Sequence, residues 1–258
     1  MTRVKVGKKY EAPAAMRLKL IVAYDGRPFL GWQSQRGGNT VQDHLEAAFA
    51  KVCGRRISVQ GAGRTDAGVH ALAQCAHADI EHNTLQPERW LTALNANLPR
   101  EIRVMRCTRA PKDFHSRFSA KGKVYAYRIW TGPVLSPFEL GRAWHLFGGV
   151  DIDILKAMAK RLTGTHDFAS FAANRGTPVE STVRTIHAIK IRKQGAVVTL
   201  TFEGNGFLYK MVRLLTGAMV RCAQGKNDAA WIGDLLAGRT KNSFAAPADG
   251  LCLVRVLY

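Results

Sequence analysis

An aspartate in a glycine-rich segment is the residue of this chain best suited to do chemistry. Asp66 lies in the run Gly61-Ala62-Gly63-Arg64-Thr65-Asp66-Ala67-Gly68-Val69-His70-Ala71. Glycines permit backbone angles and close approaches that other residues forbid, and they leave a carboxylate open to a large molecule. The alternative is that Asp66 caps a turn by accepting backbone N–H groups, as aspartate often does. Its neighbours and the charge of the whole chain favour the chemical role.

The charge of the chain predicts a polyanionic partner. The 258 residues include 38 Lys+Arg and 19 Asp+Glu, which gives a net charge of +19. A field of this sign attracts polyanions, and RNA and DNA are the commonest because Lys and Arg release the counterions condensed on phosphates. A basic but merely solvated surface is the alternative, and it brings the fold no stability.

Two further groups of residues could serve such a partner. The run Phe114-His115-Ser116-Arg117-Phe118 interleaves aromatic and cationic side chains, a mixture that stacks on bases and contacts phosphates. The same run could instead be a half-buried connector between two parts of the fold. Arg213 lies among apolar neighbours, where an unpaired cation is costly, so it needs an anionic partner. Asp66 is a candidate for that partner.

Several other kinds of site are not indicated. The five cysteines show no C-x-x-C spacing, and the histidines form no His-Glu-x-x-His motif, so we expect no metal site. Gly61 and Gly63 begin a dinucleotide-like pattern, but Asp66 occupies its third glycine position and would repel a pyrophosphate. The Walker, zinc-deaminase and Gly-x-Ser-x-Gly motifs are missing. No apolar run could span a bilayer and no signal peptide opens the chain, which predicts a cytoplasmic protein without a membrane partner.

The hydrophobic periodicity predicts a mixture of strands and helices. Thr40 is a good N-cap for a helix that Gly54 ends, and Pro87 suits the first position of the next helix. Strands are predicted over residues 18–24, 57–60, 69–80, 102–107, 124–130, 183–192, 196–202 and 250–257. The other helices are predicted over residues 151–164, 207–222 and 231–236.

This pattern favours an α+β fold with mainly antiparallel pairing, because hairpins and short strands predominate. We expect two comparable α/β halves whose sheets merge around a central basic cleft. Residues 1–15 are predicted to form a basic flexible arm. Residues 16–112 would form the half that carries the Asp66 loop, and residues 113–258 the other half.

The segments together resemble the tRNA pseudouridine synthase A family over nearly the whole chain from Leu18 onward. The most specific is Gly63-Arg64-Thr65-Asp66-Ala67-Gly68-Val69-His70. One departure is Ser181-Thr182-Val183-Arg184, where the family often has proline before Val-Arg. The other segments are Tyr24-Asp25-Gly26, Gly31-Trp32-Gln33, Asn95-Ala96-Asn97-Leu98-Pro99, Asp113-Phe114-His115-Ser116-Arg117-Phe118-Ser119-Ala120, Tyr125-Ala126-Tyr127, His166-Asp167-Phe168, Val183-Arg184-Thr185-Ile186, Asn205-Gly206-Phe207-Leu208-Tyr209-Lys210-Met211-Val212-Arg213 and Pro247-Ala248-Asp249-Gly250-Leu251.

The resemblance implies isomerisation of uridine to pseudouridine at positions 38, 39 and 40 of the tRNA anticodon stem-loop. It implies a homodimer and neither a metal nor an organic cofactor. Asp66 matches the family's catalytic aspartate, Arg213 the arginine paired with it, and Tyr125 the tyrosine that stacks on the target base. Arg64 matches the arginine that helps to flip the base, and Leu251 the apolar floor of the pocket. A non-catalytic tRNA-binding module with the same basic cleft is the alternative function.

Overall fold

The computed structural model describes residues 15–81, 85–174, 176 and 179–258. The predicted arm over residues 1–15 therefore lies, apart from Ala15, outside the described residues. The strands are β1 (Met16–Tyr24), β2 (Val59–Gly61), β3 (His70–Ile80), β4 (Ile102–Ala110), β5 (Gly122–Trp130), β6 (Trp144–His145), β7 (Gly164–Asp167), β8 (Val183–Gln194), β9 (Val197–Gly204) and β10 (Leu251–Leu257). The helices are α1 (Val41–Cys53), α2 (Pro87–Asn97), α3 (Ile152–Leu162), α4 (Met211–Ala223) and α5 (Ala229–Leu236), with a short 3₁₀ turn at Ala169–Phe171.

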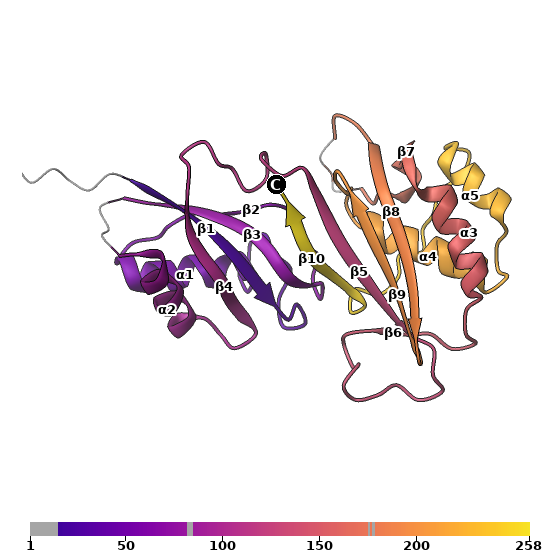
Figure 1. Cartoon of the computed structure of the whole chain (residues 1–258), viewed down its shortest axis with the longest axis horizontal. Helices are drawn as coiled ribbons and strands as arrows, with labels where there is room; N and C mark the ends of the chain where they lie inside the picture. Colours follow the sequence, from indigo (N-terminus) through magenta and orange to yellow (C-terminus); the bar gives the residue numbers. More distant parts are fainter. Residues whose placement is uncertain (1–14, 82–84, 175, 177–178) are drawn as a thin grey trace, which may run out of the picture.

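One sheet runs through the described chain and joins its two halves (Figure 1). Its strand order is β4-β1-β3-β10-β5-β9-β8-β7, with β2 paired to β3 and β6 paired to β5. The pairs are antiparallel except β10 with β3 and β5 with β6, which confirms the predicted α+β class. The C-terminal strand β10 lies between β3 of the first half and β5 of the second, so the last residues of the chain join the halves.

The helices gather in two groups beside the two halves of the sheet. Figure 1 shows α1 and α2 beside the N-terminal strands and α3, α4 and α5 beside β7, β8 and β9. Each half has its own large, fully buried side chains. They are Trp32, Trp90 and Phe49 in the first half, and Tyr127, Phe168, Phe171 and Phe202 in the second. The predicted division at residues 112 and 113 falls in the connection between β4 and β5.

Local signals placed most helix ends correctly. Thr40 caps α1 in a capping box with Asp43, and Gly54 ends it in the left-handed conformation with φ of 71°. The predicted helix over residues 207–222 is wrong at its start, because α4 begins at Met211. Lys210 has φ of 58° and no side-chain cap, so the backbone before Met211 cannot be helical. Residues 207–210 therefore form a loop, and this loop borders the site described next.

Candidate active site

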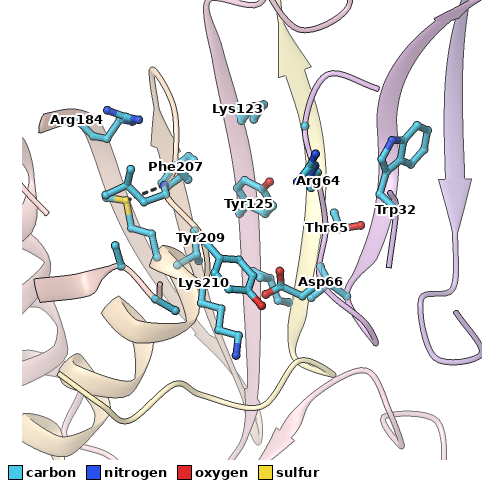
Figure 2. A pocket seen from close by; sticks show the side chains of 18 of the residues that line it. Trp32, Arg64, Thr65, Asp66, Lys123, Tyr125, Arg184, Phe207, Tyr209 and Lys210 are labelled. Carbon is cyan, nitrogen blue, oxygen red and sulfur yellow. Dashed lines mark hydrogen bonds between the residues drawn. The ribbon is translucent and has the colours of Figure 1, made fainter. Parts of the chain in front are cut away.

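A cavity of about 710 Å³ lies where the two halves meet (Figure 2). One wall is the segment from Gly61 to Asp66 together with Trp32. The central strands contribute Lys123 and Tyr125 from β5 and Leu251 from β10. The opposite wall is the loop before α4, residues 207–210, together with the first two residues of α4, Met211 and Val212. A cavity of this size is typical of sites for small molecules and would accept a single nucleotide.

The Asp66 loop is held rigidly against the first half of the sheet. Thr65 is buried, and its Oγ1 lies 2.8 Å from the Tyr24 hydroxyl. Its carbonyl accepts the backbone N–H of Trp32 at 3.1 Å. Gly31 is required beside this carbonyl, because it has φ of +93° and a Cβ there would lie 2.6 Å from the Thr65 oxygen. These contacts fix the residue immediately before Asp66.

Asp66 pairs with Arg213 across the cavity wall. Arg213 Nη1 donates to Asp66 Oδ2 at 3.3 Å, and the two side chains are only 15% and 16% exposed. Arg213 Nε also donates to the Ala246 carbonyl at 2.7 Å, so the guanidinium is held at two points. Arg213 lies among apolar neighbours in helix α4, and its anionic partner is Asp66, the candidate that the sequence offered. The alternative role for Asp66 as a turn cap does not account for this ion pair.

Tyr125 and Leu251 form an apolar part of the cavity. They lie on the neighbouring strands β5 and β10 and are 8% and 6% exposed. The Tyr125 ring contacts Phe207 edge to face, with the ring centroids 5.2 Å apart. A planar base could stack in such a place.

The other four predicted site residues are divided. Arg64 and Arg117 line the cavity, and Arg64 Nε donates to Gln33 at 3.2 Å. Phe114 and His115 are not among its lining residues. Phe114 packs on Tyr258, and His115 Nε2 bonds to Gln60 Oε1 at 2.9 Å. Their immediate role is to hold the segment that presents Arg117, as the alternative of a half-buried connector describes.

Several lining residues were given no catalytic or binding role by the sequence, among them Lys123, Arg184, Tyr209 and Lys210. In Figure 2 the Tyr209 ring points toward Asp66. Lys210 has the left-handed φ of 58°, a conformation that costs energy outside glycine and clusters at functional sites. Lys123 could have been found from the period of a strand, because it is two residues before Tyr125 and so shares its face.

Burial, together with the positive charges of Arg117 and Arg184, lowers the pKa of Lys123 to about 8 from the usual 10.5. No cluster of three or more metal-ligating side chains occurs within residues 15–81, 85–174, 176 and 179–258. In the same ranges, no helix has both the length and the apolar character needed to cross a membrane.

Comparison with known proteins decides the family. The model of a family described as tRNA pseudouridine synthase matches residues 20–119 and 158–258. The chain belongs to this family. Proteins named tRNA pseudouridine synthase A from Akkermansia muciniphila and Solidesulfovibrio magneticus are 47% and 46% identical to it, each over 94% of this chain and over 95% and 91% of their own length. A third, from Syntrophotalea carbinolica, is 40% identical over 93% of this chain and 96% of its own length.

Solved structures are more distant from this tRNA pseudouridine synthase family member. A chain of a Cbf5-Nop10-Gar1 complex is 14% identical, with a TM-score of 0.40, over 92% of this chain and 48% of that one. A likeness of this size carries no argument about the site.

Proposed function

We propose that the protein isomerises uridine to pseudouridine in tRNA, with Asp66 as the catalytic residue. The family and the names of the relatives carry the reaction. The observation that supports the site is the ion pair between Asp66 and Arg213 at the edge of a basic cavity of nucleotide size. The target positions would be 38, 39 and 40 of the anticodon stem-loop, as the resemblance implies.

The reaction needs few catalytic parts. The N1–C1′ bond of the uridine breaks, the uracil turns, and C5 bonds to C1′. The proton that C5 loses is balanced by one that N1 gains, so the product has the atoms of the substrate. Asp66 would attack the sugar or the base, or remove the C2′ proton, since covalent and base catalysis by carboxylates are both established routes.

The remaining side chains would prepare the nucleotide. A base must leave its stack before an enzyme can reach it, which costs a few kcal/mol. Arg64, exposed at the rim, could offset that cost by filling the vacated position. Tyr125 would stack on the extruded uracil, and Leu251 would exclude water beneath it while the base turns.

Assembly and location complete the proposal. We expect a homodimer, and exposed apolar side chains between β5 and α3 support one: Val134, Phe138, Leu140 and Phe147. Light scattering on the purified protein would test it. A cytoplasmic location is expected because tRNA is the substrate.

The decisive experiment compares Asp66→Asn with the wild type on tRNA that carries 5-tritiated uridine, because the C5 proton leaves during isomerisation. The substitution keeps the size of the side chain but removes its charge. Tritium release should fall by at least about a thousandfold, since a carboxylate that acts on the reacting atoms is essential. Binding of the tRNA should be nearly unchanged. Asp113→Asn, at an exposed position outside the cavity, is the matched control.

Near-normal tritium release by Asp66→Asn would remove the assigned role. A wild type that binds tRNA but forms no pseudouridine would instead favour the non-catalytic tRNA-binding module. Mapping pseudouridine in tRNA from cells with and without the protein decides which uridines are its targets.

A further inference from the structure

Lys123 is a cation that the fold itself does not use. It belongs to a cavity wall that also carries Arg117 and Arg184, and both neighbours lower its pKa. Among the residues that the structure describes, none of these three side chains forms an ion pair with a carboxylate. Asp66 is the one acidic side chain in the described lining of the cavity, and Arg213 already neutralises it.

Contacts nevertheless hold the side chains of Lys123 and Arg184 in place and fix the backbone beside Arg117. Arg184 Nη1 donates to the carbonyls of Ser181 and Val183 at 2.9 and 2.6 Å. The Lys123 amine lies against the backbone of Gly63, where a Cβ would come within 2.8 Å of Nζ. Arg117 follows Ser116, which is fully buried and donates to the Gln60 carbonyl at 2.7 Å. The fold therefore holds a cluster of like charges in an ordered arrangement.

Such a cluster raises the free energy of the folded protein unless an anion binds to it. Like charges repel one another, the partial burial of Lys123 and Arg184 adds to the cost, and the carboxylate of Asp66 in the described cavity wall is already paired with Arg213. A phosphate group fits best, because its oxygens accept several charge-assisted hydrogen bonds at once and arginine holds them in a fork.

The cluster lines the same cavity as Asp66, close enough for one short piece of RNA strand to contact both. Lys123 and Tyr125 point from the same face of β5, about 7 Å apart along the strand. Figure 2 shows Tyr125 between Lys123 and Asp66, with Arg184 and Arg64 on the two sides of Lys123. A base stacked on Tyr125 would lie beside Lys123, and a phosphate of the same RNA strand could then contact the three cations that line the same cavity.

We propose that Lys123, Arg117 and Arg184 form a subsite for one backbone phosphate beside the extruded nucleotide. This inference rests on the proposed function, since it takes the RNA strand that carries the target uridine as the ligand. Lys123 is then a positioning residue, which sets how far the nucleotide enters the cavity. Arg184 lies within the segment where the sequence departs from the usual family pattern.

The subsite makes binding dependent on pH in a defined direction. An empty subsite holds Lys123 with a pKa of about 8, so a rise from pH 7 to pH 9 removes its charge. A bound phosphate favours the charged form, and binding at pH 8 to 9 therefore takes up a proton. The charged groups that face the cavity are Arg64 and Asp66 from the loop, Arg117 from the connection, Arg184 from β8 and Lys210 from the loop before α4. The cross-strand neighbours of Lys123 on β9 and β10 are Gly204 and Val256.

The test is a double-mutant cycle in which one change is made in the protein and the other in the RNA. The affinity of each protein is measured for stem-loops in which one linkage at a time is a neutral methylphosphonate. The proteins are the wild type, Lys123→Met and the control Lys190→Met, which lies at an exposed position on β8. In every stem-loop the nucleotide at the tested linkage carries a 2′-O-methyl group. The reference is the same 2′-O-methylated stem-loop with an ordinary phosphate at that linkage. At one linkage beside the target the wild type should lose about tenfold or more in affinity. Lys123→Met should lose the same factor with the ordinary RNA and nothing more with the neutral linkage.

Losses that add independently at every linkage would overturn the subsite, as would Lys123→Met binding like the wild type. Lys123→Arg, which stays charged at every accessible pH, should keep the affinity and lose its dependence on pH between 7 and 9. Turnover of the wild type is measured first. A wild type without turnover contradicts the proposed function, whereas an active wild type with an additive cycle contradicts only the subsite.

Discussion

Arg213 and Asp66 are 147 residues apart in sequence, and Arg213 Nη1 donates to Asp66 Oδ2 at 3.3 Å. Their contact joins the first half of the molecule to helix α4 of the second. The same guanidinium donates through Nε to the Ala246 carbonyl, so its orientation is set from two directions. A charge alone could not reproduce this arrangement, because it depends on the planar fork of arginine.

Arg213→Lys should therefore reduce kcat by about tenfold to a hundredfold although the charge is kept. A lysine has a single terminal nitrogen and cannot bond to Asp66 and Ala246 in the same geometry. Arg221→Lys is the matched control, since Arg221 is in the same helix and bonds to Asn227 outside the cavity. Single-turnover rates with saturating tRNA would check this. Equal rates for the two variants would show that the fork at residue 213 is not needed.

Tyr24→Phe should slow the reaction without any contact between Tyr24 and the substrate. The buried Tyr24 hydroxyl lies 2.8 Å from Thr65 Oγ1, directly before Asp66. The variant leaves Thr65 without this partner, which costs about 1–2 kcal/mol and loosens the catalytic loop. Tyr258→Phe removes a comparable bond to the Ser116 carbonyl, between two residues outside the cavity lining, and should lower thermal stability while leaving kcat nearly unchanged. A Tyr24→Phe enzyme with the wild-type kcat would contradict the coupling.

The sequence predicted those parts of the site that have a local signature. The glycines around Asp66 and the apolar neighbours of Arg213 identified both members of the ion pair. Tyr209 and Lys210 were missed because the apolar period of α4 runs back to Phe207, so the sequence predicted a helix there. The left-handed conformation of Lys210 that ends this period has no signal in a lysine.

Contacts between distant segments were the other part of the structure that the sequence could not predict. Phe114 and His115 have the residue types of an RNA-binding surface, yet they pack on Tyr258 and Gln60. Tyr258 is the last residue of the chain, and its place beside Phe114 follows from the insertion of β10 between β3 and β5. Pairing of strands so far apart in sequence is not encoded in any local pattern.

His77 should make the protein unstable in acid. His77 is 3% exposed, and its Nδ1 accepts the backbone N–H of Ser116 at 3.2 Å. Burial, then the charges of His115 and Arg17, lower the pKa of His77 to about 4, while Asp79 opposes them. The unfolded chain binds this proton near pH 6.5 and the folded protein only near pH 4, so stability is lost as the pH falls through that window.

The free energy of unfolding should fall by about 1–3 kcal/mol between pH 6.5 and pH 4 through this residue. Urea unfolding at a series of pH values would measure the fall. His77→Asn, whose amide oxygen can accept the same N–H, should show a flatter profile. The control His187→Asn, at an exposed position on β8, should follow the wild type. Identical slopes for His77→Asn and the wild type would assign the acid sensitivity to other groups.

Lys123→Met should stabilise the protein in the absence of RNA. The pKa of Lys123 is about 8 when folded and 10.5 when unfolded, so at pH 7 the native state holds a charge that its surroundings disfavour. Between pH 8 and pH 10.5 the unfolded chain binds this proton and the folded one does not, and stability rises with pH in that window. Methionine fills a similar volume without the charge. We expect a gain of about 1–3 kcal/mol at pH 7 and little gain above pH 10. Thermal melts of Lys123→Met and Lys190→Met at both pH values would measure it, and a Lys123→Met protein less stable than the wild type at pH 7 would show that the amine is part of the fold rather than held ready for a phosphate.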